Sequence, residues 1–578
     1  MAVEDQVEEL TRKDRRFLPN DFEITTWQAL KPYYDKLLER NPDSKEALRE
    51  WFRDRSELEA VVSEDLGWRY IRMTCDTTDE EATKAYQYFV TEIDPNIAPL
   101  AHEMNRKVLE NPHLEELKKE EGYDVMVRGI EKEFTLFREE NIPLNTEIQT
   151  NSQKFAAITG AMSVTINGQE YTLQQANDFL YSLDREVREN AYRKVQDRRL
   201  QDREKLDALF DTLVKLRDQV AKNADKANYR DYMFESLGRF DYTPQDCFQF
   251  HESVLAEAVP VKDQMEQQRK EQLGVDELRP WDKQVNAEGK ESLKPFKGGA
   301  DLLDRTITCF SRLDPYLGSC LETMKEMGHL DLESRKGKAP GGYNYPLLET
   351  GVPFIFMNAT STLRDLVTML HEGGHAVHSF LTKNLEIKDF KDAPSEIAEL
   401  ASMSMELLSM DHWDVFFDNE EDLKRAKKEH LEQIIDVLPW VACIDKFQHW
   451  IYENPGHTDK ERADMWLQIY EDFSDDVTDW SDLELNRRFA WQKQLHLFEV
   501  PFYYIEYGFA QLGAIAVWKN YRENPEKGLQ GYLNALKLGY TQSIPEVYEA
   551  AGIKFDFRRE YIRELMQFVR TELEKAGS

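Results

Sequence analysis

The segment that most constrains the fold of this chain is His371-Glu372-Gly373-Gly374-His375, which has the pattern H-E-x-x-H. Two histidines four positions apart lie on one face of a helix, so their imidazoles can bind the same zinc ion. Glu372 lies beside them and is suited to act as a general base. The fold must therefore bring a further ligand to the histidine face of this helix.

A third ligand is expected after Pro394, where the acids Glu396, Glu399 and Glu406 lie in a segment of helical character. A catalytic zinc ion usually takes three protein ligands and keeps one position for water. The stretch between His375 and Glu399 is long enough for one helix to end and for a second helix to return beside it. One carboxylate of that second helix would complete the site. Glu396 is most simply a solvated or capping acid near the start of the helix.

These residues resemble the oligoendopeptidase F branch of the thimet-type oligopeptidases, peptidase family M3. In that family an H-E-x-G-H-x-x-H helix is followed by a helix that reads A-E-[VL]-A-S, and residues 398–402 of this chain read Ala-Glu-Leu-Ala-Ser. The resemblance implies that His371, His375 and Glu399 hold the metal. It also implies that Glu406 accepts a hydrogen bond from a ligand imidazole. His378 is expected to support or pack against the site rather than bind the ion.

The approach to this helix is also similar to the family. Pro340-Gly341-Gly342-Tyr343, followed by the strand-like residues 354–357, resembles the family's glycine-rich turn and adjacent strand. The resemblance implies that Gly341 and Gly342 help to hold an extended peptide by main-chain hydrogen bonds. An ordinary buried strand at 354–357 is an equal alternative.

A late segment, residues 496–508, resembles the family's pattern of a histidine, then Pro-Phe-Tyr, then a further tyrosine. The resemblance implies that His496 and Tyr507 donate hydrogen bonds to the developing oxyanion. Tyr503 and Tyr504 are candidates for contact with the substrate. The chain departs from the family at Leu497 and Ile505, where aromatic residues are frequent, so the assignment among the three tyrosines stays open.

Most of the chain is predicted to be helical, because charged and apolar residues alternate at three- and four-residue spacing in residues 27–40, 79–92, 173–218, 420–437 and 556–575. Strands are expected at 163–171, with Asn167-Gly168 as a hairpin turn, and before the zinc helix. With the resemblance, this predicts a two-lobed, zincin-like helical metallopeptidase that has a deep channel and a small β element. We expect an N-terminal helical region, 1–200, and a catalytic region, 201–578, in one closed body.

The resemblance implies a zinc-dependent oligoendopeptidase that holds one Zn²⁺ per chain and hydrolyses internal bonds of short peptides. Glu372 would take a proton from the attacking water and pass it to the leaving amine. A zinc carboxypeptidase is not excluded by these motifs. A non-catalytic peptide-binding protein on the same fold is a second alternative, although the retained Glu372 argues against it.

Composition limits the partners and the compartment. The net charge of −35 would repel nucleic acid and anionic membranes, so oligopeptides are the expected partners. The five cysteines have no disulfide-like spacing and none resembles a zinc ligand, and His251 and His449 are expected to be ordinary surface or core histidines. Residues 1–10 are acidic and do not resemble a secretory signal, and no apolar run suits a membrane span. These features predict a cytoplasmic protein and leave its oligomeric state open.

Overall fold

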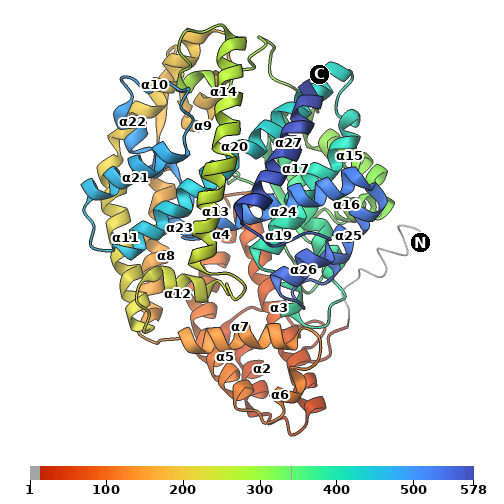
Figure 1. Ribbon diagram of the computed structural model, residues 1–578. Helices are drawn as coiled ribbons and strands as arrows, with labels where there is room; N and C mark the ends of the chain where they lie inside the picture. Colours follow the sequence, from red (N-terminus) through yellow and green to blue (C-terminus); the bar gives the residue numbers. More distant parts are fainter. Residues whose placement is uncertain (1–13, 340, 578) are drawn as a thin grey trace. The chain divides into compact units, whose positions relative to one another are not determined.

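Helices dominate the computed structural model, which describes residues 14–339 and 341–577 (Figure 1). The chain falls into two compact units. The first comprises the described parts of 1–135, 294–427 and 510–555, and the second those of 136–293, 428–509 and 556–578. Neither unit has a boundary at residue 200, so the two regions expected from the sequence, like the channel, stay predictions. The acidic segment 1–10 and Pro340 lie outside the described residues.

The first unit contains the helix that carries the H-E-x-x-H pattern. Its helices are α2 (Trp27–Glu39), α3 (Lys45–Cys75), α4 (Glu80–Tyr88), α5 (Asp94–Leu109), α6 (Leu114–Leu117), α7 (Tyr123–Leu136), α15 (Gly298–Leu313), α16 (Pro315–Met327), α17 (Leu363–Thr382), α18 (Lys388–Lys391), α19 (Ser395–Leu408), α25 (Pro525–Lys537) and α26 (Ile544–Ala550). A large apolar cluster includes Tyr34, Trp51 and Phe52 from the N-terminal helices and also Phe390. Burial of these rings joins the N-terminal helices to the segment between α17 and α19.

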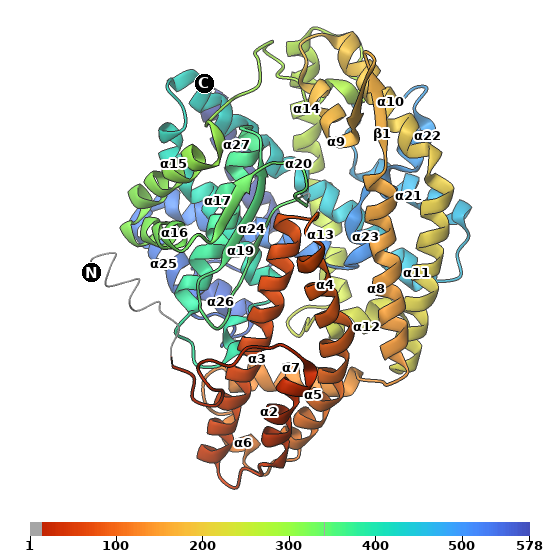
Figure 2. The ribbon, with the colours of Figure 1, turned by 180° about the vertical axis from the view of Figure 1, so that it is seen from behind.

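A three-stranded sheet lies beside α17 (Figure 2). Strand β5 (Phe354–Ala359) is central, with β3 (Leu330–Glu333) parallel on one side and β4 (Tyr343–Tyr345) antiparallel on the other. The predicted strand before the zinc helix is thus confirmed. Residues 354–357 are buried, as the buried-strand alternative expected, and Ile355 and Phe356 pair with strands on both sides. The edge of the sheet next to Gly341 and Gly342 belongs to β4.

The second unit is helical apart from one hairpin. Its helices are α8 (Asn141–Gly160), α9 (Leu173–Asn177), α10 (Arg185–Gln201), α11 (Arg203–Asn223), α12 (Tyr229–Ser236), α13 (Pro244–Glu257), α14 (Val259–Leu273), α21 (Asp459–Phe473), α22 (Glu484–Arg488), α23 (Leu495–Glu499) and α27 (Arg559–Gly577). Two helices, α20 (Glu420–Glu453) and α24 (Tyr504–Glu523), contribute residues to both units. The helical stretch predicted at 173–218 is interrupted, because Asp184 caps the start of α10.

The predicted hairpin is confirmed by strands β1 (Ser163–Ile166) and β2 (Gln169–Thr172), which pair in antiparallel register. Asn167 and Gly168 have φ angles of 52° and 80°. Positive φ at both central residues is the requirement of a tight two-residue hairpin turn, which explains the Asn-Gly pair.

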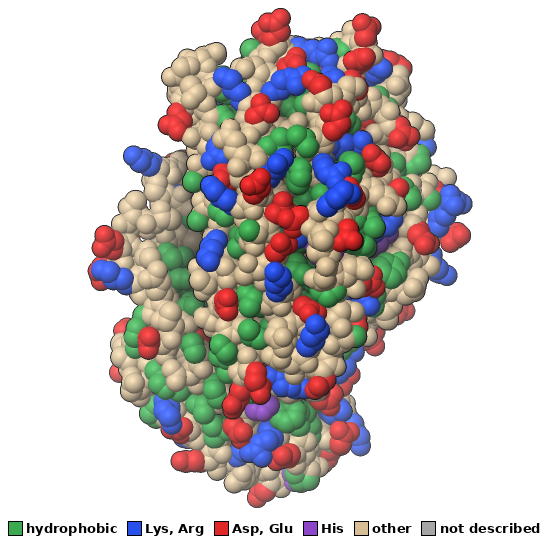
Figure 3. Space-filling model, turned by 90° about the vertical axis from the view of Figure 1, so that its left-hand side faces the viewer, with side chains coloured by type: hydrophobic (Ala, Val, Ile, Leu, Met, Phe, Trp, Pro, Cys, Tyr) green, Lys and Arg blue, Asp and Glu red, His purple; other side chains and the backbone are tan. Residues whose placement is uncertain are grey.

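Acidic and basic side chains intermingle on the face shown in Figure 3. The excess of acidic residues is therefore not gathered into a single acidic patch on this face. Among the described residues, none of the helices combines the length and the apolar character that crossing a membrane requires.

Candidate active site

Helix α17 presents both histidines of the H-E-x-x-H pattern on one face. Thr362 caps its first turn, and Thr362 and Asp365 form a reciprocal capping box. The rings of His371 and His375 lie 4.9 Å apart at nearly right angles, as four-residue helical spacing predicts. Each imidazole keeps about a fifth of its surface exposed, 20% and 19% respectively, so both can be reached from outside.

Helix α19 packs directly against α17 and brings Glu399 to the two histidines. Oε2 of Glu399 lies 3.3 Å from Nε2 of His371 and 3.7 Å from Nε2 of His375. Ligands bound to zinc at 2.0–2.2 Å lie about 3.3–3.6 Å apart at tetrahedral angles, close to both separations. The three donor atoms therefore have the chemistry and the spacing of a zinc site, and they form one of two such groups in the described chain.

Two hydrogen bonds hold these donor atoms from behind. Nδ1 of His371 lies 2.6 Å from Oε1 of Glu406, and Oγ of Ser402 donates to Oε2 of Glu399 over 3.1 Å. Such outer partners set the tautomer and orientation of metal-binding groups. The sequence predicted the contact of Glu406 but assigned no role to Ser402. Its position three residues after Glu399, on the same helical face, is the signal that would have found it.

The electrostatics of the group favour a bound cation. Burial alone would raise the pKa of Glu399, but the hydrogen bond with His371 and the nearby imidazoles lower it to about 2. Burial lowers the pKa of His375 to about 4, so its lone pair is available at neutral pH. Burial by itself would lower the pKa of His371. The hydrogen bonds and charges of Glu399 and Glu406 outweigh burial and raise this pKa well above the ordinary value. Two carboxylates around one imidazole demand a positive charge at this place, which a proton or a metal ion can supply.

Glu372 is buried beside the histidines, with 7% of its surface exposed. Burial raises the pKa of its carboxyl to about 7, although the charge of His371 opposes that rise. A carboxylate with a pKa near neutrality can both accept and release a proton at physiological pH. Its main-chain oxygen accepts a hydrogen bond from Asn344, a residue of β4.

The structure agrees with the prediction for His378 and contradicts part of the prediction for Glu396. His378 is buried and stands outside the group of ligand atoms, as the supporting role expected. Glu396, in contrast, is not a solvated acid: only 2% of it is exposed. The hydroxyl of Tyr548 donates to its main-chain oxygen, so the first turn of α19 is packed against other helices. The solvated alternative was wrong, because the sequence does not show which side of this turn is covered, whereas Glu396 does lie in the first turn of α19, as a capping acid would.

The remaining predicted residues of the first unit are Gly341 and Gly342, which precede β4. Gly341 has φ of +98°, a conformation that side chains other than glycine rarely adopt. Its carbonyl oxygen accepts a hydrogen bond from Asn358, near the end of β5. The glycine pair is therefore tied to the sheet and leads directly into its edge strand.

The second unit contains the predicted cluster of one histidine and three tyrosines. The ring of His496 lies 4.8 Å from that of Tyr504, 5.9 Å from Tyr507 and 6.2 Å from Tyr503. Nε2 of Gln494 lies 2.7 Å from Nδ1 of His496. Burial raises the pKa of Tyr504 to about 12.

A strained residue supports this cluster. Phe502, which directly precedes Tyr503, has φ of +69°, a conformation that costs about 1–3 kcal/mol in a non-glycine residue. Gln448 accepts a hydrogen bond from its amide, and the buried Arg239 donates to its carbonyl oxygen and, over 3.0 Å, to Glu506. Sequence analysis missed Arg239 and Gln448, because nothing local marks them as partners of a distant turn.

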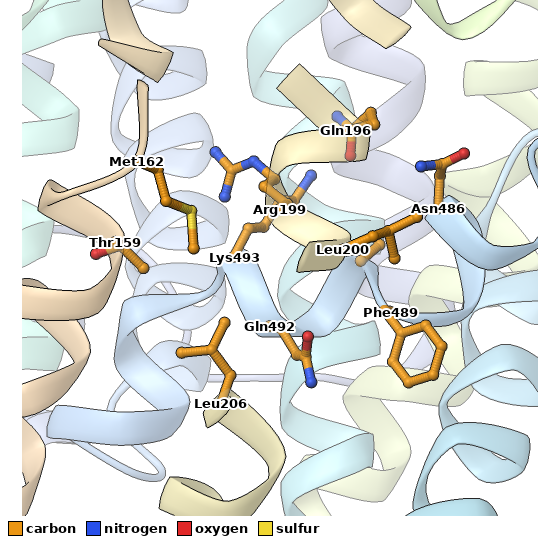
Figure 4. Close-up of a pocket in the computed structure, with 11 residues that line it drawn as sticks. Thr159, Met162, Gln196, Arg199, Leu200, Leu206, Asn486, Phe489, Gln492 and Lys493 are labelled. Carbon is orange, nitrogen blue, oxygen red and sulfur yellow. The ribbon is translucent and has the colours of Figure 1, made fainter. Parts of the chain in front are cut away.

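A small pocket in the second unit has no acidic residue in its lining (Figure 4). It is lined by Thr159, Met162, Gln196, Arg199, Leu200, Leu206, Asn486, Phe489, Ala490, Gln492 and Lys493. Figure 4 shows the side chains of Arg199 and Lys493 next to each other. Burial, together with the charge of Arg199, lowers the pKa of Lys493 to about 8, although solvent still reaches this side chain.

A mainly helical fold with a histidine pair and a carboxylate grouped beside a buried glutamate defines a metallopeptidase of the H-E-x-x-H class. The profile described as Peptidase family M3 matches residues 179–306 and 317–567, and that of the Peptidase M3 N-terminal domain matches 17–137. The chain belongs to peptidase family M3. The predicted family and fold class are thereby confirmed, whereas the roles of single residues stay predictions.

Known relatives agree with this placement. Oligopeptidase PepF of Bacillus subtilis is 22% identical over 498 residues, which cover 82% of this chain and 70% of that protein. The structure of PZ peptidase A with an inhibitor has a TM-score of 0.89 at 26% identity and covers 97% of this chain and 99% of its own. A putative oligoendopeptidase F has the same TM-score, 0.89, at 26% identity, over 97% of this chain and 98% of its own.

Proposed function

We propose that this chain is a zinc-dependent oligoendopeptidase that hydrolyses internal bonds of short peptides. The observation that carries the proposal is the approach of the donor atoms of His371, His375 and Glu399 to within 3.3 and 3.7 Å, beside the buried Glu372. Membership of peptidase family M3 supports peptide hydrolysis. The names of the relatives, oligopeptidase and oligoendopeptidase F, support short peptides and internal bonds.

In this proposal His371, His375 and Glu399 hold one Zn²⁺ ion per chain. Zinc bound there would supply Lewis acidity, which polarises the carbonyl group of the peptide bond that is to be broken. Glu372 accepts a proton from the attacking water and delivers it to the leaving amine, a task that suits a carboxyl with a pKa of about 7. Glu406 keeps the His371 ring in place through its hydrogen bond to Nδ1.

Other residues are proposed to bind the peptide. The edge of β4, next to Gly341 and Gly342, offers main-chain groups with which an extended peptide can pair. His496 and Tyr507 are proposed as donors to the developing oxyanion, and Tyr503 and Tyr504 as substrate contacts. The five cysteines, all in the described part of the chain, form no disulfide, which supports the predicted cytoplasmic location.

The test combines zinc analysis with cleavage of a short, internally quenched peptide by the native chain and by Glu372→Gln. We expect zinc in both proteins and turnover by the native chain alone. Glu110→Gln, which changes an exposed carboxylate at the end of α5, is the matched control and should cleave normally. Zinc without turnover of varied peptides would favour a binding protein. Cleavage only of peptides with a free C-terminus would favour a carboxypeptidase.

A further inference from the structure

Two helices of the second unit each carry a pair of metal-ligating residues spaced four apart. Cys247 and His251 lie on α13, and Asp445 and His449 lie on α20. This spacing places each pair on one face of its helix, as in the H-E-x-x-H pattern. The four residues are buried, with exposed fractions of 0%, 3%, 0% and 2%. Facing helices with inward ligand pairs are the usual way to build a metal site in a helical bundle.

The donor atoms of these residues are already close together. The ligand atoms of Cys247, Asp445 and His449 all lie within 4.8 Å of one another. Nε2 of His449 is 3.2 Å from Oδ2 of Asp445, and Nε2 of His251 is 2.8 Å from the same oxygen. Sulfur, nitrogen and oxygen ligands of one zinc ion lie about 3.3–3.7 Å apart, so small side-chain movements would complete the group.

Several polar atoms of the cluster lack a hydrogen bond. Within the described parts of the chain, Oδ1 of Asp445 and both ring nitrogens of His449 have no hydrogen-bond partner, because the 3.2 Å approach of His449 to Asp445 is poorly aligned. The ring of His449 is packed against those of Phe248 and Phe502, at 4.8 and 5.4 Å. Polar atoms enclosed by aromatic rings are expensive unless something binds them.

The charges in the cluster also call for a cation. Asp445 is fully buried, and its ion pairs in the described chain are with His251 and His449, not with a lysine or arginine. A zinc ion bound by the Asp445 carboxylate, a Cys247 thiolate and a neutral His449 would leave the group without net charge. Mixed sulfur, nitrogen and oxygen donors are a set that zinc accepts.

We propose that Cys247, Asp445 and His449 bind a second, structural zinc ion, separate from the proposed active site. Oδ1 of Asp445 is the carboxylate oxygen still available as a ligand. His251 is a positioning residue, because its hydrogen bond to Oδ2 orients that carboxylate. This proposal departs from the expectation that Cys247, His251 and His449 are ordinary residues. Their two pairs are far apart in the sequence, so no local motif reveals them.

The first test counts metal ions in the untagged, full-length protein after zinc loading and removal of weakly bound metal. We expect about two zinc ions per chain in the native protein and about one in His371→Ala/His375→Ala. Cys247→Ser/His449→Gln should also hold about one, at the proposed active site. A native protein that holds only one ion, lost with His371 and His375, would overturn the proposal. In that case a protonated histidine balances the charge of Asp445.

The second test replaces zinc by cobalt(II), which occupies similar sites and reports its ligands by absorption. A cobalt–thiolate charge-transfer band in the near ultraviolet is expected, because only the Cys247 site supplies sulfur. The band should persist in His371→Ala/His375→Ala and in Cys309→Ser, which changes another buried cysteine. It should vanish in Cys247→Ser. Absence of the band from the native chain would refute the proposal, even if the Cys247 variant fails to fold.

Discussion

Gly374→Ala is the substitution whose consequences can be worked out most closely. A Cβ atom at Gly374 would lie 2.6 Å from Cα of Ser402, 2.8 Å from the main-chain oxygen of Ala401 and 3.0 Å from Cβ of Met405. Two of these atoms belong to the backbone of α19, so no side-chain rotation relieves the contact. Comfortable separations are about 3.5–4.0 Å, so α17 and α19 must move apart by about 1 Å.

Such overpacking costs about 1–3 kcal/mol of stability, and the higher helix propensity of alanine returns about 1 kcal/mol. We therefore expect a net loss of about 1 kcal/mol. The larger effect is on zinc, because the same movement takes Glu399 on α19 away from His371 and His375. Metal sites tolerate displacements of only about 0.2 Å, so zinc binding should weaken about ten- to hundredfold.

The assay is competition for zinc with a chromophoric chelator, together with urea unfolding. Gly373→Ala is the matched control, because its Cβ would meet ring atoms of Phe310 at 2.8 and 2.9 Å, and a side chain can turn aside. Its zinc affinity should stay within about threefold of native. Native affinity in Gly374→Ala, or equal losses in both variants, would refute the reasoning.

Three further predictions concern single side chains. Glu406→Leu removes the acceptor at Nδ1 of His371 and should weaken zinc binding about ten- to hundredfold. Glu406→Gln keeps an acceptor oxygen and should lose less zinc affinity. Equal losses of affinity in the chelator assay would contradict this prediction. Tyr507→Phe should lower kcat about a hundredfold with little change in KM, if its hydroxyl donates to the oxyanion, and the same loss in Tyr503→Phe instead would reassign that role. The pKa of Lys493 is lowered from 10.5 to about 8, so its charge destabilises the folded state at pH 7 and this cost disappears as pH rises from 8 to 10.5. Lys493→Met should therefore raise the unfolding free energy at pH 7 by about 1 kcal/mol, a value discounted because Lys493 is an exposed residue, and a gain independent of pH would contradict the argument.

Short-range features of this protein could be predicted from its sequence. The histidine pair on α17 follows from the helical repeat, and the hairpin turn at Asn167 follows from the positive φ that Asn and Gly tolerate. The strand before the zinc helix was also predicted. Each of these depends on neighbours within a few residues, where backbone geometry leaves few alternatives. The proximity of Glu399 was predicted only through resemblance to a known family.

Contacts between distant segments were decided by the tertiary structure alone. The sequence does not show that β5 is the central strand and β4 the edge, or that Arg239 and Gln448 hold the strained Phe502. Nor does it show that Cys247 on α13 meets Asp445 on α20. Which faces of separate helices meet depends on the packing of many side chains at once. A single sequence therefore determines the chemistry that each helix carries, and the packed structure determines which of these chemical groups come together.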